Sequence, residues 1–342
     1  MEINFKSFRS ASENVDSLAD IRKQNGERVL DLHIGFFDDC IRGIGQTDIV
    51  LLGAGSGVGK TEAAAHIAYS NAAAGKKILF LALEAENLEI EQRQMYKIFA
   101  RRYFADKQKQ TGVNINYTDF QFNRLDHVYD KYKKDCVAEM KKVKNLYTRY
   151  TTSEYTLDQL VIDVENASDM DAIMLDHLHI MSLGGEAENK AFKSALIKIR
   201  SIVLEKRIPM IILSQLRKDS GQNQNSSVMP DISDFHGSSD IFKIATKGIM
   251  FASGVGVVDA SHDRATRRPT LVKVVKNRTD GSTKIYTGAT VFDVSTNSYD
   301  EDYVVGNLKW VKDEETKMKV EKFIPTPEGD LPFWAKKDKR KW

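Results

Sequence analysis

Residues 53–68 read GAGSGVGKTEAAAHIA, a glycine-rich stretch that runs through Gly-Lys-Thr into a series of alanines. It follows the apolar run TDIVLL and leads into an alanine-rich segment with helical character. When a glycine-rich turn joins a strand to a helix, its backbone N–H groups converge on phosphate oxygens, and the helix dipole favours the bound anion. The sequence therefore predicts a phosphate-binding loop at this turn.

The end of the turn matches the phosphate-loop pattern G-x-x-x-x-G-K-[ST], in which the lysine reaches the β- and γ-phosphates and the hydroxyl joins Mg²⁺. Its first position is Ala54 instead of glycine, a modest relaxation in a turn that keeps three other glycines. The alternative, a glycine-rich turn with a chance lysine, fits the flanking strand and helix less well. The residues expected to bind the nucleotide are Gly55, Ser56, Gly57, Val58, Gly59, Lys60, Thr61 and Glu62.

The composition is that of a globular protein with a buried core. The 342 residues are 42% hydrophobic and 29% charged, and they leave room for one large or two modest domains. The net charge is only +2, so the chain as a whole does not have the strongly basic composition that is typical of many nucleic-acid-binding domains. No apolar run approaches the ~20 residues that cross a bilayer, and residues 1–20 are too polar for a signal peptide. With only Cys40 and Cys136 as cysteines, we expect a cytoplasmic location without a membrane partner.

Strands and helices alternate along the chain from residue 48. The expected buried strands are TDIVLL, KKILFLALE, DAIMLDHLHIM and IPMIILSQL, and GIMFASG, TLVKVVKN and KIYTGATVFD follow, the last two as a hairpin across residues 279–282. Strands rich in Ile, Leu and Val with helices between them indicate an α/β fold, with a mainly parallel sheet flanked by helices and a C-terminal antiparallel hairpin. Helices are expected at 60–74, 87–104, 124–147, 157–164 and 189–204.

Two carboxylates follow strands that we expect beside the phosphate loop. Glu84 ends KKILFLALE, where it can align and deprotonate an attacking water, or it simply begins a solvated helix, as Glu86 and Glu89 do. Asp176 follows four almost entirely apolar residues. A lone carboxylate at the end of a buried strand is costly unless it is paired or near a metal, so Asp176 suits a second contact to Mg²⁺.

Later strands carry three further candidates. Gln215, after MIILS, can hydrogen-bond a γ-phosphate and report it to the long polar loop that follows. Lys276 and Arg278 lie two residues apart on a strand and hence on one face. Such cations are often solvated surface charge, and they would also serve as a clamp that completes a phosphoryl-transfer site of a neighbouring subunit.

Taken in order, these segments resemble the helicase half of DnaB-type replicative helicases, a RecA-like family that forms hexameric rings. The phosphate loop alone is shared by many families, but the ordered set, with Ser-Gln in one motif and Lys-x-Arg in another, is much more specific. The match extends over roughly residues 30–293, and six segments carry it. They are VLDLHIGFFDDCIRGIGQTDIVLLGAGSGVGKT, FLALEAE, IMLDHLHIM, MIILSQLRK, DFHGSSDIFKIATKGIMF and VVKNRTDG.

The resemblance implies a role for each matching residue in the nucleotide site. Lys60 and Thr61 would hold the phosphates of ATP and Mg²⁺, Asp176 would support the metal, and Glu84 would activate water. The cofactors implied are therefore ATP and Mg²⁺, and the activity implied is an ATP hydrolase coupled to DNA unwinding.

The same resemblance implies how the site connects to DNA and to a second subunit. Gln215 would couple the γ-phosphate to DNA-binding loops, and Arg278, assisted by Lys276, would act on ATP bound by the adjacent subunit. Family members translocate along single-stranded DNA through the centre of the ring. The expected loops carry few basic residues, and the candidates for DNA contact are Lys190, Arg217 and Lys218.

The expected organisation has three parts. Residues 1–30 form an arm with helical spacing that packs on a neighbouring subunit, in place of the family's N-terminal collar. Residues 31–310 form the RecA-like ATPase domain, and residues 311–342 form a basic tail, for which a solvated terminus is the simplest interpretation. A homo-hexamer, a primase and a helicase loader are the implied protein partners, in the host cytoplasm if a phage encodes the chain. Residues 96–147 match no motif.

Two other functions share much of this pattern. A RecA-like recombinase, which forms an ATP-gated DNA-binding filament, has the same phosphate loop, glutamate and sheet, but LDHLHIM and KNR fit the helicase pattern better. A scaffold of the circadian-clock ATPase type would use ATP without a DNA substrate.

Overall fold

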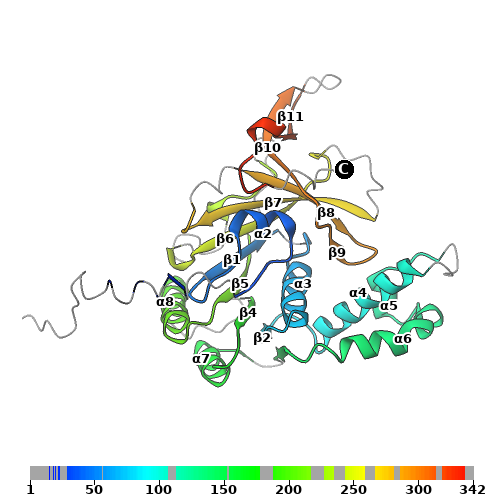
Figure 1. The fold of residues 1–342 in the computed structure, drawn as a ribbon, viewed down its shortest axis with the longest axis horizontal. Helices are drawn as coiled ribbons and strands as arrows, with labels where there is room; N and C mark the ends of the chain where they lie inside the picture. Colours follow the sequence, from blue (N-terminus) through cyan, green and yellow to red (C-terminus); the bar gives the residue numbers. More distant parts are fainter. Residues whose placement is uncertain are drawn as a thin grey trace, which may run out of the picture.

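The central strand of the sheet, in a computed structural model of the chain, is β1 (Ile49–Ala54), and both of its faces are buried (Figure 1). Val50 and Leu52 pack in one core with the helix that follows the strand, while Ile49 and Leu51 pack in a second core on the other face. A strand covered on both sides needs an apolar residue at every position, which explains the unbroken run IVLL.

The structure describes residues 29–335 except 56, 107–112, 152–153, 178–187, 217–226, 235–242, 259–265, 281–285 and 313–317, together with Val15, Leu18, Asp20, Arg22 and Lys23. Val15 and Leu18 are helical and about half exposed, and Ile21 lies outside the described residues. Within the described part of the chain, no helix combines the length and apolar composition that crossing a bilayer would need.

One mixed sheet of eleven strands runs through the described part of the molecule in the order β11-β10-β8-β7-β6-β1-β5-β4-β2-β3, with β9 paired to β8. The strands from β6 to β3 run parallel, and those from β7 to β11 pair antiparallel. The remaining strands are β2 (Ile78–Ala82), β3 (Leu146–Tyr150), β4 (Ala172–Asp176), β5 (Met210–Gln215), β6 (Lys247–Ser253), β7 (Arg267–Asn277), β8 (Thr287–Asp293), β9 (Ser298–Tyr299), β10 (Val304–Lys312) and β11 (Lys319–Pro325).

Helices cover both faces of the sheet, as the α/β prediction requires (Figure 1). The first face is covered by α2 (Gly35–Ile41) and α3 (Lys60–Ala73), whose alanines allow the helix to approach the strands closely. The second face is covered by α7 (Leu157–Asn166) and α8 (Glu188–Lys206), through residues such as Leu160 and Leu196. The mainly parallel sheet and the antiparallel pairing of β7 with β8 are confirmed.

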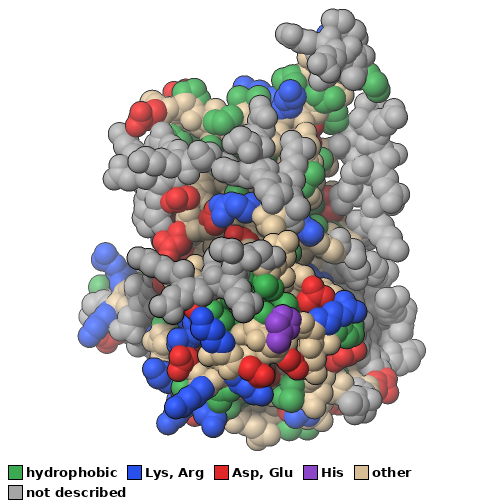
Figure 2. All heavy atoms as spheres, turned by 90° about the vertical axis from the view of Figure 1, so that its right-hand side faces the viewer, with side chains coloured by type: hydrophobic (Ala, Val, Ile, Leu, Met, Phe, Trp, Pro, Cys, Tyr) green, Lys and Arg blue, Asp and Glu red, His purple; other side chains and the backbone are tan. Residues whose placement is uncertain are grey.

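A satellite of three helices stands out from the sheet (Figure 1). It consists of α4 (Glu89–Ala105), α5 (Tyr117–Gln121) and α6 (Asp126–Met140), and it has its own aromatic core around Phe99 and Tyr96. Its outer face carries interspersed basic and acidic side chains, as the lower part of Figure 2 shows. The stretch 96–147, which matches no motif, is thus mostly a packed helical unit joined to the phosphate-loop face of the sheet.

Several elements differ from the expectation. The helix expected at 124–147 ends at Met140, and LYTRY begins at Leu146 as the edge strand β3. Its alternating half-buried and exposed residues suit an edge, where one side chain in two faces solvent. The short helices α2 and α5 and the strands β9, β10 and β11 were not predicted, and β11 lies within residues 311–342, which we assigned to a basic tail.

Candidate active site

The phosphate loop leaves the carboxyl end of β1 and turns into α3, as the sequence predicts. Gly57 and Gly59 have φ angles of +77° and +94°, in the left-handed region that glycine adopts at little cost. Gly59 is the N-cap of α3 and has no side chain to satisfy the first-turn N–H groups. These amides and the helix dipole therefore remain available to an anion.

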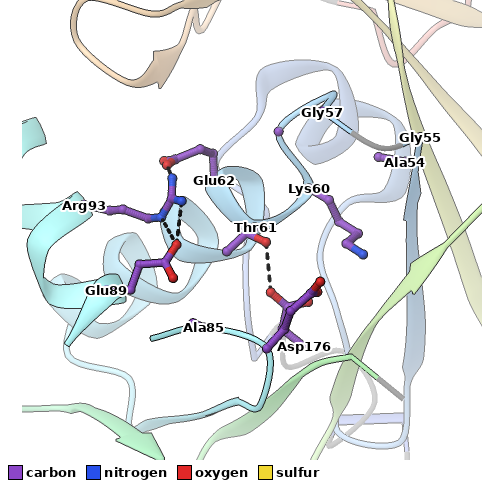
Figure 3. Close-up of a pocket in the computed structure, with 12 residues that line it drawn as sticks. Ala54, Gly55, Gly57, Lys60, Thr61, Glu62, Ala85, Glu89, Arg93 and Asp176 are labelled. Carbon is purple, nitrogen blue, oxygen red and sulfur yellow. Dashed lines mark hydrogen bonds and ion pairs between the residues drawn. The ribbon is translucent and has the colours of Figure 1, made fainter. Parts of the chain in front are cut away.

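A pocket of about 410 Å³ opens at this loop (Figure 3). It lies at the carboxyl ends of the parallel strands, where α/β sheets bind their ligands. Most of the residues expected to bind nucleotide or metal line it, and Glu84 joins them. The lining residues are Ala54, Gly55, Gly57, Gly59, Lys60, Thr61, Glu62, Glu84, Ala85, Glu89, Arg93 and Asp176.

Thr61 and Asp176 come together at the floor of the pocket (Figure 3). The hydroxyl of Thr61 donates a hydrogen bond of 3.0 Å to Oδ2 of Asp176, and Asp176 is only 1% exposed. Burial raises the pKa of the Asp176 carboxyl, while Lys60 and then Thr61 act in the opposite direction. The other oxygen, Oδ1, has no hydrogen-bond partner among the described residues, and such a buried acceptor is costly. A hydroxyl beside an unsatisfied carboxylate suits a hard cation such as Mg²⁺.

Glu84 lies beside this floor, just past the end of β2. The amides of Leu83 and Glu84 donate to the carbonyl of Asp176 at 2.9 and 3.3 Å, which ties the ends of β2 and β4 together. The side chain of Glu84 is 53% exposed, and its Oε2 lies 3.5 Å from Nε2 of His177. A carboxylate held at the rim in this way has access to water within the pocket.

One wall of the pocket is a charged network that the sequence analysis did not identify. Arg93 on α4 forms ion pairs with Glu62 and with Glu89, whose Oε1 accepts from Nη2 at 2.6 Å (Figure 3). The guanidinium also lies 5.0 Å from the ring centre of Tyr117, and burial lowers the pKa of Arg93. The spacing of Glu89 and Arg93, four residues apart on a helix, was the available signal for part of this network. That spacing predicts an ion pair on the surface of a helix, but it does not indicate that the pair lines a pocket.

Gln215 ends β5 and pairs in register with Ala54, so its backbone lies next to the start of the phosphate loop. Its side chain is not described, and neither is that of Lys190, whose backbone belongs to α8. Ser56, Arg217 and Lys218 lie outside the described residues. The candidates for DNA contact therefore remain predictions.

Lys276 and Arg278 are not brought to this pocket. In register, Val50 pairs with Lys247 and Lys247 pairs with Asn277, and the amide of Arg278 donates to the carbonyl of Thr246 at 3.0 Å. Arg278 therefore lies level with the amino end of β1, about 17 Å along the strand from the phosphate loop at ~3.3 Å per residue. The pocket of its own chain lies at the carboxyl ends of the parallel strands, so Arg278 is on the opposite side of the sheet, where these strands begin.

Comparisons with known proteins agree with this architecture. The model of the DnaB-like helicase C-terminal domain matches residues 31–299, which is more than half of the chain. A solved structure described as an ATPase domain superposes with a TM-score of 0.68 at 14% identity, over 85% of this chain and 98% of that one. A DnaB-like replicative helicase, studied with its interactions with primase, superposes with a TM-score of 0.66 at 14% identity, over 85% of this chain and 66% of that one. A search of curated proteins found no match.

Proposed function

Because this chain belongs to the DnaB-like helicase family, we propose that it is an ATP-dependent replicative DNA helicase that moves along single-stranded DNA as a hexameric ring. ATP bound in the pocket would be hydrolysed at the interface between two subunits. The energy of hydrolysis would be coupled to unwinding of the duplex.

The observation that carries this proposal is the separation of Arg278 from the phosphate-loop pocket of its own chain, since the two lie at opposite ends of β1. Phosphoryl transfer requires a cation near the charge that develops on the transferred group. Lys60 enters the pocket from its own subunit, whereas Arg278 lies at the far edge of the sheet. A second copy of the chain, arranged head to tail, would bring its Arg278 to this pocket, and repeated contacts of that kind form a ring when the rotation between subunits closes and a filament when it does not.

Within one subunit, the proposed roles follow the contacts of the pocket. Lys60 and the first amides of α3 would bind the phosphates. Thr61 and Asp176 would hold Mg²⁺, which when bound would offset the negative charge that develops on the transferred phosphoryl group. Glu84 would accept the proton of the attacking water. Gln215 would contact the γ-phosphate and pass the contact to the loop after β5.

Outside the pocket, the proposal assigns functions to three parts of the chain. Residues 1–30 would form the arm that packs on a neighbouring subunit. The exposure of the apolar side chains of Val15 and Leu18 supports this proposal, because such side chains favour contact with another surface. Residues 31–310 would form the ATPase domain, and β11 from the segment 311–342 would extend its sheet instead of belonging to a solvated tail. Lys190, Arg217 and Lys218 would contact DNA. A primase, a loader and a cytoplasmic location are proposed from the family alone.

Asp176→Asn is expected to weaken Mg²⁺ binding in the presence of ATP by roughly 10- to 100-fold, because the floor of the pocket loses the buried carboxylate charge that would face the metal. The affinity is measured by titrating Mg²⁺ and following the ATPase rate or a fluorescent nucleotide. Asp171→Asn is the matched control, since Asp171 lies just before the other end of β4 and accepts from the amide of Lys77. Unchanged Mg²⁺ affinity in Asp176→Asn would remove Asp176 from the metal site.

The proposed function is tested by the ATPase rate with and without single-stranded DNA, together with the mass of the oligomer in a non-hydrolysable nucleotide. Strong stimulation and a hexamer mass are expected. Stimulation on filaments of indefinite length would favour the recombinase alternative. No stimulation by DNA would contradict a DNA motor.

A further inference from the structure

A cluster of three polar side chains lies at the amino end of β1, on the edge of the sheet opposite the pocket. The carboxylate of Asp48 accepts hydrogen bonds from the hydroxyl of Thr246 at 2.6 Å and from the amide of Gly45 at 2.8 Å. It also forms an ion pair with the ammonium of Lys247. Asp48 directly precedes β1, Thr246 directly precedes β6 and Lys247 is the first residue of β6, so the cluster joins two neighbouring strands at their starts.

The cluster is almost completely removed from water. Lys247 is only 4% exposed, and the side chain of Asp48 is 13% exposed. A buried ammonium is strongly unfavourable unless a carboxylate and further hydrogen bonds compensate it. The ion pair therefore keeps the ammonium of Lys247 next to the carboxylate of Asp48. As a result, the start of β6 has little freedom to move away from β1.

The start of β6 in turn holds Arg278. The amide of Arg278 donates to the carbonyl of Thr246 at 3.0 Å, and its Nη2 donates to the carbonyl of Lys243 at 2.6 Å. The residue before it, Asn277, pairs with Lys247 across the β6–β7 ladder. Both the backbone and the guanidinium of Arg278 thus contact the short segment 243–247, which Asp48 fixes.

We propose that Asp48 is a positioning residue for Arg278. Through Thr246 and Lys247 it fixes the segment 243–247, to which Arg278 is hydrogen-bonded. The guanidinium is thereby positioned to contact ATP bound by the next subunit. This inference rests on the proposed function, in which Arg278 acts across the interface.

The phosphate loop of the same chain does not depend on the Asp48 carboxylate in this way. Every residue of β1 pairs with β5, and Val50 to Ala54 also pair with β6, so two ladders of backbone hydrogen bonds hold the carboxyl end of the strand. Asp48 itself contributes its backbone carbonyl to Met210, a contact that survives substitution of the side chain. Loss of the carboxylate charge should therefore impair the arginine and spare the pocket.

Asp48→Asn tests this asymmetry, because asparagine has the same size and keeps an acceptor for Thr246 but no longer neutralises Lys247. A displacement of a catalytic group by about 1 Å costs roughly 10²-fold in rate, so we expect kcat to fall by about that factor with the KM for ATP unchanged. Asp169→Asn is the matched control. It removes an exposed ion pair with Lys77, on a different part of the surface, and should keep the wild-type rate.

Mixtures of variants then show which half of the interface is impaired. Lys60→Ala subunits have a defective pocket and an intact Arg278, so mixing them with Asp48→Asn subunits should restore hydrolysis in the Asp48→Asn pockets. Mixing Asp48→Asn with Arg278→Ala should restore nothing, since neither variant supplies a well-placed arginine. A general loss of folding would not produce this one-sided pattern.

Each outcome is decisive. The role of Asp48 would be overturned if Arg278→Ala subunits restored ATP hydrolysis in mixtures with Asp48→Asn. It would also be overturned if Lys60→Ala subunits failed to restore it. Failure of the reference mixture, Arg278→Ala with Lys60→Ala, would instead contradict the proposed interface site itself. If Asp48→Asn does not fold, Thr246→Val replaces it, because it removes the hydroxyl that joins Asp48 to the segment, and the same one-sided pattern is expected.

Discussion

Arg278→Ala is expected to retain ATP binding and the oligomer mass while its kcat falls by about 10³-fold or more, the usual effect of losing an arginine supplied across an interface. The guanidinium would stabilise charge that develops only in the transition state, so its removal should affect kcat and leave nucleotide affinity almost unchanged. Steady-state ATPase kinetics give kcat, and titration with a fluorescent ATP analogue gives the affinity.

The matched control for this variant is Arg268→Ala. Arg268 is an exposed arginine on the same strand, β7, near the end of the strand that lies away from Asn277 and the segment 243–247. It should hydrolyse ATP at the wild-type rate. Full activity of pure Arg278→Ala would end the proposed role of this arginine. A loss of ATP binding would contradict a role confined to the transition state.

Glu84→Gln is expected to bind ATP and assemble normally but to hydrolyse ATP about 10²- to 10⁴-fold more slowly, the range that a general base contributes. The amide keeps the size of the side chain and its place beside Asp176, but it no longer accepts a proton. Single-turnover hydrolysis with ATP pre-bound separates this chemical step from binding and product release.

Glu86→Gln is the control for Glu84→Gln. Glu86 lies two residues farther along, is exposed, and is absent from the pocket lining, so its substitution should not change the rate. Rapid turnover by Glu84→Gln would exclude Glu84 as the base. In that case Glu89, which also lines the pocket and whose pKa burial raises, would be the next candidate.

The part of the fold around the phosphate loop was predictable because its signals are local. The run IVLL, the positive-φ glycines at 57 and 59, and the alanine-rich helix each depend on a few consecutive residues. The same holds for Asp176, because a carboxylate after a buried apolar strand requires compensation wherever the strand lies.

The rest depends on contacts between distant segments. Arg93 lies at the pocket because α4 packs against α3, which carries its partner Glu62. β11 was missed because its lysines resemble a solvated tail, and only pairing with β10 from Gly306 to Lys312 makes it a strand. Local patterns do not encode such pairings, and the buried ion pair of Asp48 with Lys247 is likewise visible only in the folded chain.

Helicase activity is measured by strand displacement from a duplex that carries a single-stranded tail, with ATP and Mg²⁺ present. We expect the wild-type protein to release the paired strand, and we expect Glu84→Gln and Arg278→Ala to bind the tailed duplex without releasing it. DNA-stimulated ATP hydrolysis by the wild-type protein without displacement, whichever strand carries the tail, would contradict the proposal that this chain is a helicase.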